Sequence, residues 1–360
     1  MEHAAPTAGA RGRILVSAWL NGVGPYPFLL DTCVLAPVIA QDAAQLIWLP
    51  LKSPSPNMTV VDVENFVVAD LPPHPVEMAL ADLSALSERL ATPLAGLLPA
   101  QMAGLEITID LAHARASWRP LEQSTLPKAA RTAPLRIEKD GAPMVSVLIN
   151  GKHLRPLAVD ITRPDAIALP ESELRAVGAW GDEAPIMTLH TADGQTIRYL
   201  RLAQFRVGDA GMDEPLCAVL PPGNAGRLGI AFLKLFRVTM NFEHGLIALE
   251  RSDARVFREA PLTGTGASLG RHHAGFWYLD IIEGSPAHHA GLRSGDRLLA
   301  VNGVPAAEMA RGPGAGYDAL APMLSPPPGA IVFLTVGRPD SAHPAGMVEI
   351  NAPVESAILF

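Results

Sequence analysis

The chain has 360 residues and a formal net charge of −8 at pH 7, and its basic residues are dispersed, which argues against a protein that binds nucleic-acid phosphates. Hydrophobic residues make up 49% of the chain and charged residues 18%, a balance that provides buried cores and excludes wholesale disorder. The 34 prolines and 31 glycines are spread throughout, which predicts a mainly β chain of short strands and turns with small helices.

Several further features narrow the class of protein. The apolar stretch at residues 14–30 is interrupted by polar, glycine and proline residues, so no transmembrane helix is predicted. Cys33 and Cys217 are the two cysteines, which excludes a disulfide framework and supports no zinc motif. Residues 1–12 are predicted to form a flexible tail, and they lack the apolar core of a secretory leader. We therefore expect either a cytoplasmic protein or a leader that lies outside this chain.

The first element in chain order is a strand, a turn and a second strand that ends in a carboxylate. Residues 16–22 (Val-Ser-Ala-Trp-Leu-Asn-Gly) are followed by residues 27–33 (Pro-Phe-Leu-Leu-Asp-Thr-Cys). An Asn-Gly pair after alternating apolar residues predicts a tight hairpin, because Asn and Gly tolerate positive φ angles. The second strand is predicted to be buried and to carry Asp31 at its end. A short helix is predicted over 40–49, and strands are predicted over 59–71 and 76–80.

The same framework recurs about 130 residues later. Residues 145–151 (Val-Ser-Val-Leu-Ile-Asn-Gly) lead to Asp160 with the same spacing, and a helix is predicted over 170–177. Both copies also close alike, since residues 96–113 and 226–244 each begin with glycine, continue as an apolar strand and end in histidine. This period is too long for a solenoid repeat and typical of a duplicated domain, so the two aspartates are predicted to lie face to face.

The repeats and the composition divide the chain into parts. An Asp-Gly turn signal between apolar strands predicts a mobile flap at Thr191, Ala192, Asp193 and Gly194. From about residue 262 the character changes, which predicts a separate domain. The predicted parts are a flexible tail (1–12), lobe 1 (13–120), a polar and proline-rich linker (121–134), lobe 2 (135–251), a C-terminal domain (262–351) and a C-terminal tail (352–360).

Two stretches carry resemblances to known families. The duplicated hairpin leading to an aspartate, closed by residues 228–239 (Leu-Gly-Ile-Ala-Phe-Leu-Lys-Leu-Phe-Arg-Val-Thr), resembles bacterial retropepsin-type aspartyl proteases with two lobes in one chain. Residues 284–303, with Gly-Ser-Pro-Ala, Ala-Gly-Leu, Gly-Asp and Val-Asn-Gly, resemble the PDZ domains of bacterial proteases. The implied fold is mainly β, a two-lobed acid-protease-like pair of β-barrels plus a C-terminal PDZ domain, in a chain that is monomeric because both lobes are present.

The protease resemblance implies a pair of catalytic aspartates, Asp31 and Asp160. Two adjacent carboxylates share one proton, so that one acts as general base to a water and the other polarises the scissile carbonyl, without metal or cofactor. In this family Asp-Thr-Gly is usual, whereas here Asp31-Thr32-Cys33 and Asp160-Ile161-Thr162 stand in its place. Thr32 is expected to brace the site from one side, and the side chains of Cys33 and Thr162 are expected to narrow it.

Three functions remain open from the sequence. The first is an aspartic-type endopeptidase that hydrolyses extended polypeptide. The second is a catalytically degenerate pseudo-protease that binds peptides as an adaptor, favoured by the loss of both glycines. The third is a scaffold whose lobes are purely structural. The family resemblance suggests the periplasm or cell envelope if a leader was removed, while the residues themselves leave the compartment unknown.

The PDZ resemblance implies that peptide C-termini are bound by backbone amides at Gly275, Phe276, Trp277 and Tyr278, while the partner adds a strand to the sheet edge. Trp277 is equally consistent with the buried face of a strand. The helix lining the groove is predicted over 317–324. Residues 356–360 are predicted either to form a last packed strand or to plug such a groove. The pairs His272-His273 and His288-His289 lack further ligands at metal spacing, and no metal site is predicted there.

Overall fold

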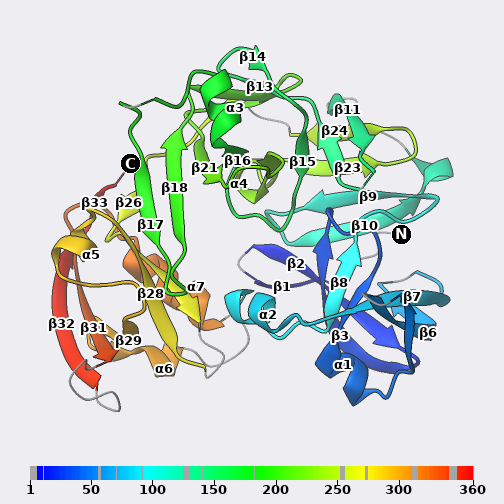
Figure 1. Cartoon of the computed structure of the whole chain (residues 1–360), viewed down its shortest axis with the longest axis horizontal. Coiled ribbons are helices and arrows are strands. Elements are labelled where there is room, and N and C mark those ends of the chain that lie inside the picture. The colour runs from blue at the N-terminus through cyan, green and yellow to red at the C-terminus, as the bar shows by residue number, and fades with distance from the viewer. Residues whose placement is uncertain are drawn as a thin grey trace. The chain divides into compact units, whose positions relative to one another are not determined.

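The computed structural model describes residues 6–10, 12–55, 58–69, 71–90, 92–124, 130–139, 141–181, 183–251, 256–271, 275–309, 315–339 and 347–359. This part of the chain is mainly β, as predicted, with short helices between the strands (Figure 1). Within it, none of the helices combines the length and the apolar character needed to span a bilayer. The chain forms two compact units, described separately below: unit 1 is Met1–Ala85, Pro93–Ala184 and Arg201–Glu259, and unit 2 is Leu86–Thr92, Pro185–Leu200 and Ala260–Phe360.

The first half of unit 1 is an eight-stranded sheet with the strand order β1-β2-β3-β8-β4-β7-β6-β5. The helix predicted over 40–49 and the strands predicted over 59–71 and 76–80 are confirmed with shifted bounds. The elements are β1 (Pro6–Ala10), β2 (Arg13–Leu20), β3 (Val23–Asp31), β4 (Val38–Ala40), α1 (Gln41–Leu46), β5 (Leu51–Ser55), β6 (Met58–Val68), β7 (His74–Ala81), α2 (Ser84–Leu90, assigned mostly to unit 2) and β8 (Gly96–Pro99). Strand β1 falls within the predicted tail and pairs antiparallel with β2.

The second half of unit 1 repeats this plan with shorter strands, and the helix predicted over 170–177 is confirmed as α3. Its elements are β11 (Arg131–Ile137), β12 (Pro143–Val145), β13 (Leu148–Ile149), β14 (Lys152–His153), β15 (Leu157–Val159), β16 (Ile167–Pro170), α3 (Glu171–Ala176), β19 (Gln204–Val207), β20 (Ala210–Asp213), β21 (Leu216–Leu220), β22 (Arg227–Leu228), α4 (Ile230–Leu233), β23 (Arg237–Asn241), β24 (Leu246–Glu250) and β25 (Val256–Arg258). The halves are connected through β9 (Leu105–Asp110), β10 (Arg115–Pro120) and η1 (Leu121–Gln123).

The predicted Asn-Gly turns are present in both halves. Asn21 and Gly22 have φ angles of 50° and 81°, and Asn150 and Gly151 have 49° and 75°, the left-handed values that a tight hairpin requires. Each asparagine also uses its side-chain Oδ1 to accept backbone N–H groups from a neighbouring strand. The turns therefore fix the register of the strand that ends at each aspartate.

The strands around the two aspartates follow one topology. In the first half β3 pairs parallel with β8, β4 pairs antiparallel with β8, and β4 pairs parallel with β7. In the second half β15, β22, β16 and β21 repeat these three pairings in the same order. The matched glycines Gly96 and Gly226 lie where a Cβ atom would come within 2.2 Å of the Val38 carbonyl oxygen and within 2.4 Å of Leu157 Cδ2, respectively.

A shared sheet joins the two halves. Strand β9 pairs antiparallel with β10 on one side and with β23 on the other, and β23 continues the sheet through β24 to β11. At its centre the buried hydroxyl groups of Thr108 and Thr239 are hydrogen-bonded at 3.0 Å. The turns after β9 and β23 are also alike, since the backbone N–H groups of His113 and His244 donate to the side chains of Asp110 and Asn241. Duplication therefore extends to the closing turns.

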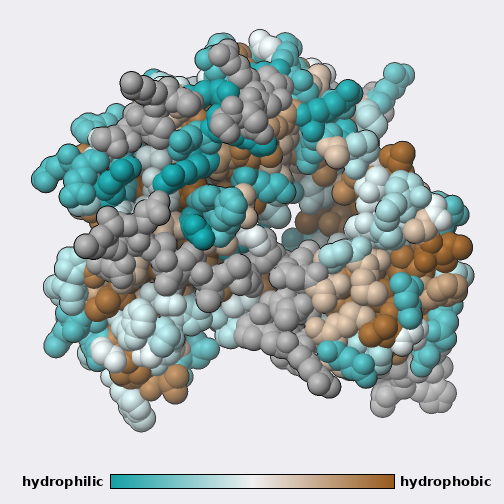
Figure 2. All heavy atoms as spheres, turned by 180° about the vertical axis from the view of Figure 1, so that it is seen from behind, coloured by the Kyte–Doolittle hydropathy of each residue, from teal (hydrophilic) through white to brown (hydrophobic). Residues whose placement is uncertain are grey.

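Unit 2 contains a second sheet around its own core. Its elements are β17 (Met187–His190), β18 (Thr196–Arg201), β26 (Thr263–Gly264), β27 (Ala267–Arg271), β28 (Trp277–Ile282), α5 (Pro286–His289), β29 (Arg297–Val301), β30 (Val304–Pro305), α6 (Ala306–Met309), α7 (Ala315–Leu324), β31 (Ile331–Pro339), β32 (Met347–Glu355) and β33 (Ala357–Ile358). Trp277, Leu279, Leu320 and Leu334 are among the core residues. Figure 2 shows hydrophobic residues over β31 and β32, where Ile331 and Phe333 are exposed.

A buried ion pair stabilises this sheet. The Asp296 side chain is 2% exposed, and it accepts hydrogen bonds from Arg338 Nε at 2.7 Å and Nη2 at 2.6 Å. Asp296 also accepts the backbone N–H of Arg293 at 2.8 Å. The Gly-Asp signal in the sequence therefore marks a turn before β29 that is fastened to β31.

Candidate active site

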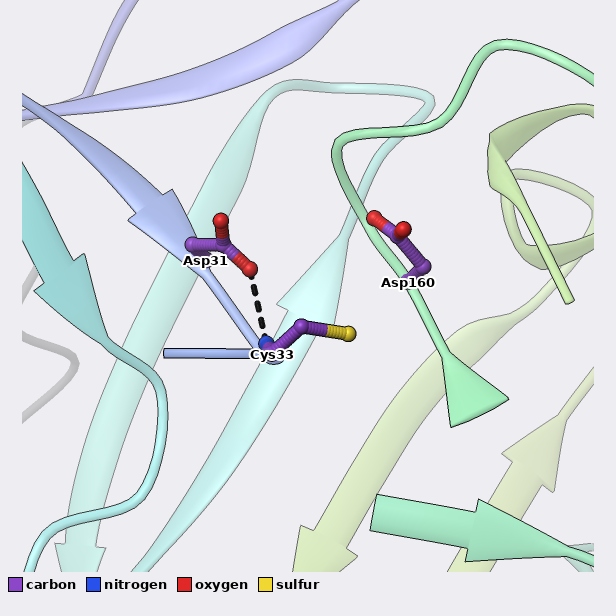
Figure 3. Close-up of side chains that lie close together, drawn as sticks. All are labelled: Asp31, Cys33 and Asp160. Carbon is purple, nitrogen blue, oxygen red and sulfur yellow. Dashed lines mark hydrogen bonds between the residues drawn. The ribbon is translucent and has the colours of Figure 1, made fainter. Parts of the chain in front are cut away.

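The structure brings Asp31 and Asp160 together. Asp31 is the last residue of β3, and Asp160 directly follows β15, the matched strand of the second half. Side-chain atoms of Asp31, Cys33 and Asp160 all lie within 4.8 Å of one another, and Figure 3 shows the two carboxyl groups turned toward each other. Both aspartates are partly exposed, so solvent reaches them.

The loops after the aspartates hold the carboxylates in the same way. The backbone N–H of Cys33 donates to Asp31 Oδ1 at 2.7 Å, and that of Thr162 donates to Asp160 Oδ1 at 3.0 Å. The Thr162 hydroxyl donates to the same oxygen at 2.7 Å. The threonine of the second motif is thus displaced by one position and still contacts its aspartate, although it makes a different bond from Thr32.

Thr32 connects the two halves. Its hydroxyl, on a side chain that is 4% exposed, donates to the Val159 carbonyl at 2.5 Å and accepts the Ile161 N–H at 3.2 Å. Ile161 occupies the matched position and has no hydroxyl with which to return these bonds. Arg13 adds a second link, because its Nε donates to the Thr162 carbonyl at 2.6 Å. Both links hold the Asp160 loop against the first half.

The environment of Asp31 favours its protonated form. Burial raises the pKa of Asp31 from 3.8 to about 6; the hydrogen bond from the Cys33 N–H opposes this rise, the charge of Asp160 adds to it, and the charge of Arg227 opposes it. One carboxyl of the pair therefore retains a proton in mildly acidic solution. This is the condition under which a carboxyl group donates a proton while its neighbour accepts one.

Arg227 lies beside the pair and was not among the residues predicted for the site. Its Nη1 donates to Cys33 Sγ at 3.1 Å and lies 3.7 Å from Asp160 Oδ2. The matched glycines could have revealed it, since Arg227 follows Gly226 as Leu97 follows Gly96. It places a cation at the position where the first half has the apolar Leu97.

Asp31, Cys33 and Asp160 have the spacing of potential metal ligands, but their surroundings oppose a cation. Burial, with added repulsion from Asp160 and Asp31, raises the pKa of the Cys33 thiol to about 12, so the thiolate that a metal requires is disfavoured. The guanidinium of Arg227 also faces the sulfur. The chemistry that suits this donor set is proton transfer between carboxyl groups.

The predicted flap is a hairpin of unit 2. Residues 191–195 connect β17 to β18, with Gly194 at φ 81° and the Thr191 N–H bonded to the Gln195 carbonyl at 2.9 Å. Strand β17 also pairs antiparallel with β28. The Ala192 N–H donates to Asp280 Oδ1 at 2.8 Å, and Ser294 Oγ donates to the His190 carbonyl at 2.6 Å. The hairpin thus forms part of the sheet of unit 2.

Comparisons with known proteins give one family match. The family model for the PDZ domain matches residues 277–337. Residues 277–337 form a PDZ domain. A search of curated proteins finds no match to this chain.

The chain is also similar to two solved structures, with low sequence identity and low TM-scores. A retropepsin-like aspartic protease from Rickettsia conorii is 17% identical over 33% of this chain and 89% of that chain, with a TM-score of 0.27. Basic 7S globulin from soybean is 11% identical over 70% of this chain and 97% of that chain, with a TM-score of 0.40.

Two of the four PDZ residues predicted to bind a terminal carboxylate lie inside a central strand. Trp277 and Tyr278 belong to β28 and pair with β27 on one side and with β29 on the other, which leaves no open edge at these two residues. Gly275 and Phe276 precede the strand, with Gly275 at φ 85°. The helix predicted over 317–324 is present as α7 (Ala315–Leu324), which packs against β27.

The last described residues form a short strand that pairs with β26, although Ile358 is exposed, so of the two predicted alternatives the strand is present. Ala357 and Ile358 pair with Gly264 and Thr263, and the Leu359 N–H donates to the Leu262 carbonyl at 2.8 Å. Phe360 lies outside the described residues, as do His272 and His273. His288 and His289 are exposed on α5.

Proposed function

We propose that the protein hydrolyses extended polypeptide with Asp31 and Asp160 and docks peptide termini on its PDZ domain. The observation that carries the hydrolytic proposal is the pair of facing carboxyl groups at matched strand ends, one of which has a pKa raised to about 6. The bonds from Cys33 to Asp31 and from Thr162 to Asp160 support it, because preorganised carboxylates need little rearrangement during reaction. The bond from Thr32 to the Val159 carbonyl holds the residue before Asp160 in place.

The residues suit a direct attack by water. Asp160 accepts a proton from the water while the water oxygen bonds to the carbonyl carbon, and Asp31 donates its proton to the carbonyl oxygen. The tetrahedral product then collapses: Asp160 gives its proton to the leaving amine as the C–N bond breaks, and Asp31 regains a proton from a hydroxyl group. Carboxylic acid and amine leave, and the aspartates return to their starting states.

A peptide library and denatured casein, incubated with the full chain between pH 3 and about 8, test this proposal. We expect cleavage on the acidic side of neutrality and a loss of at least about a hundredfold in rate for both Asp31→Asn and Asp160→Asn. Both variants should retain the thermal unfolding profile of a folded protein. A wild-type chain that is inert over the whole range contradicts the hydrolytic proposal.

Peptide binding without turnover is the second candidate. Cys33 favours it, because its side chain stands beside the carboxylates where the related motif has glycine, and Arg227 contacts its sulfur. Calorimetry with library peptides distinguishes the two functions, since this alternative expects saturable heat and intact peptide after prolonged incubation.

For the PDZ domain we propose that β27 and α7 bind the peptide. The turn before β27 is well anchored, because Thr265 donates to the Leu324 carbonyl from its backbone N–H at 3.0 Å and from its hydroxyl at 2.9 Å. Fluorescence anisotropy tests terminal-carboxylate binding by comparing the affinities of peptides with a free C-terminus and of the same peptides with an amidated one. Deleting residues 356–360 should strengthen binding if the tail competes with the peptide, and unchanged affinity would exclude that competition.

A further inference from the structure

Arg227 breaks the internal symmetry of the candidate active site. In the first half Leu97 pairs with Leu29, two residues before Asp31, and in the second half Arg227 pairs with Ala158, two residues before Asp160. Paired residues of neighbouring strands share a face, as do residues two apart on one strand. Leu97 and Arg227 therefore hold equivalent places beside Asp31 and Asp160, one apolar and the other cationic.

The guanidinium of Arg227 is engaged at one end. Nη1 contacts Cys33 Sγ at 3.1 Å and lies 3.7 Å from Asp160 Oδ2. Across the residues that the structure describes, Nε and Nη2 have no hydrogen-bond partner, and the side chain is 33% exposed. An arginine fork with two unpartnered donors is the group that best binds a carboxylate through two parallel hydrogen bonds.

We propose that Arg227 binds a carboxylate of the polypeptide substrate next to the scissile bond, while the equivalent place at Leu97 receives an apolar side chain. This proposal rests on the function proposed above and specifies its substrate class. The cation compensates the charge that a substrate carboxylate brings toward Asp160. The chemistry fits an acidic side chain within a peptide and equally fits the free C-terminus of a short one, and the experiment separates these sources.

Binding of matched peptides to the full chain with Asp31→Asn, which prevents turnover, tests the inference. One amidated peptide series carries Glu or Gln at each successive position, and a second carries no acidic side chain and ends in a free or amidated terminus. We expect Glu at one position to improve Kd at least about tenfold over Gln, which is the worth of a charge-assisted bidentate pair. A free terminus that gives this gain instead identifies the carboxylate as terminal.

The variants Arg227→Leu and Arg227→Lys assign the effect to this residue. Arg227→Leu makes the two halves alike at this position and should abolish the Glu preference, so that the Glu and Gln peptides bind with Kd values within about twofold of each other. Arg227→Lys should retain part of the preference, because the charge remains and the fork is lost. A terminal-carboxylate gain that survives Arg227→Leu belongs to the PDZ domain and overturns the inference, as does a Glu to Gln ratio near one in the parent protein.

Failure of this inference is distinguishable from failure of hydrolysis. The Glu to Gln ratio is a binding measurement, so a preference that depends on Arg227 in a chain that never cleaves peptide supports the carboxylate site and contradicts the peptidase. Cleavage whose rate changes neither with Glu in the peptide nor with Arg227→Leu supports the peptidase and contradicts the carboxylate site. If Arg227→Leu unfolds, Leu97→Arg supplies the test, since it should add a second preferred Glu position on the other side of the scissile bond.

Discussion

The two halves of unit 1 have the same backbone plan and different side chains around their aspartates. Both use an Asn-Gly turn, a parallel strand beginning at or next to a tightly enclosed glycine, and a backbone N–H that binds the carboxylate two residues earlier. Thr32 is matched by Ile161, and Leu97 by Arg227. The comparison teaches that duplication preserved what holds each carboxylate, while hydrogen bonding and charge around the carboxylates became one-sided.

The largest effect should come from removing the one-sided brace. Thr32→Val leaves the buried Ile161 N–H and the Val159 carbonyl without their hydroxyl partner, so the free energy of unfolding should fall by about 3 kcal/mol. The matched change Ile161→Val removes one methylene from a buried side chain and should cost about 1 kcal/mol. Urea unfolding measures both, and equal losses in the two variants would show that the halves are braced alike.

A second test uses the pKa of Asp31, which burial raises from 3.8 to about 6. Between these values the folded protein binds more protons than the unfolded chain, so Asp31 makes stability fall as pH rises from about 4 to about 6. Asp31→Asn removes this loss and should gain up to about 3 kcal/mol relative to wild type between pH 4 and pH 7. Denaturant titrations at several pH values measure it, and parallel wild-type and variant curves would contradict the raised pKa.

The two enclosed glycines differ in the atoms that surround them. Gly96→Ala places a Cβ against the Val38 carbonyl, which cannot turn aside, and should cost about 3 kcal/mol. Gly226→Ala meets the end of the Leu157 side chain, which can move, and should cost about 1 kcal/mol. Thermal unfolding of the two variants compares them. A greater loss for Gly226→Ala would mean that the second half is the more rigid.

The smallest difference concerns the turns. Asn150 accepts two backbone N–H groups through Oδ1, from Ala203 and Gln204, whereas Asn21 accepts one from Asn65. Substitution of either asparagine by glycine keeps the left-handed turn and removes only the side-chain bonds. Asn150→Gly should therefore cost about 1 kcal/mol more in unfolding free energy than Asn21→Gly, and equal urea midpoints would count against this reading.

Much of the frame around the aspartates could be predicted from the sequence because its signals are local. An Asn-Gly pair predicts positive φ angles at its own two residues, and an apolar run predicts a buried strand. The equal spacing of these two signals in the two halves therefore predicted that Asp31 and Asp160 lie at matched strand ends. The strand-turn-strand hairpin around Asp193-Gly194 was found for the same reason.

The rest depends on contacts between distant residues. No local sequence pattern near Leu189 predicts its pairing with Ile282, because tertiary packing decides which strands pair when they lie far apart in the sequence. Arg227 was missed since its role arises only when β22 lies beside β15. The backbone of Trp277 and Tyr278 was expected to be open to a peptide, and no local pattern predicts that β27 and β29 pair with it on both sides.

The pairing of β17 with β28 has a practical consequence for anyone who dissects this protein. A fragment ending at residue 259 keeps the β17–β18 hairpin but loses β28, the strand that pairs with β17. The edge of β17 is then unpaired, and an unpaired strand edge promotes aggregation. A fragment beginning at residue 260 keeps β28 but lacks β17, so the same two residue pairs are lost. Residues 185–200 and residues 260–360 should therefore be kept in the same protein when parts of this chain are expressed, exchanged or crystallised.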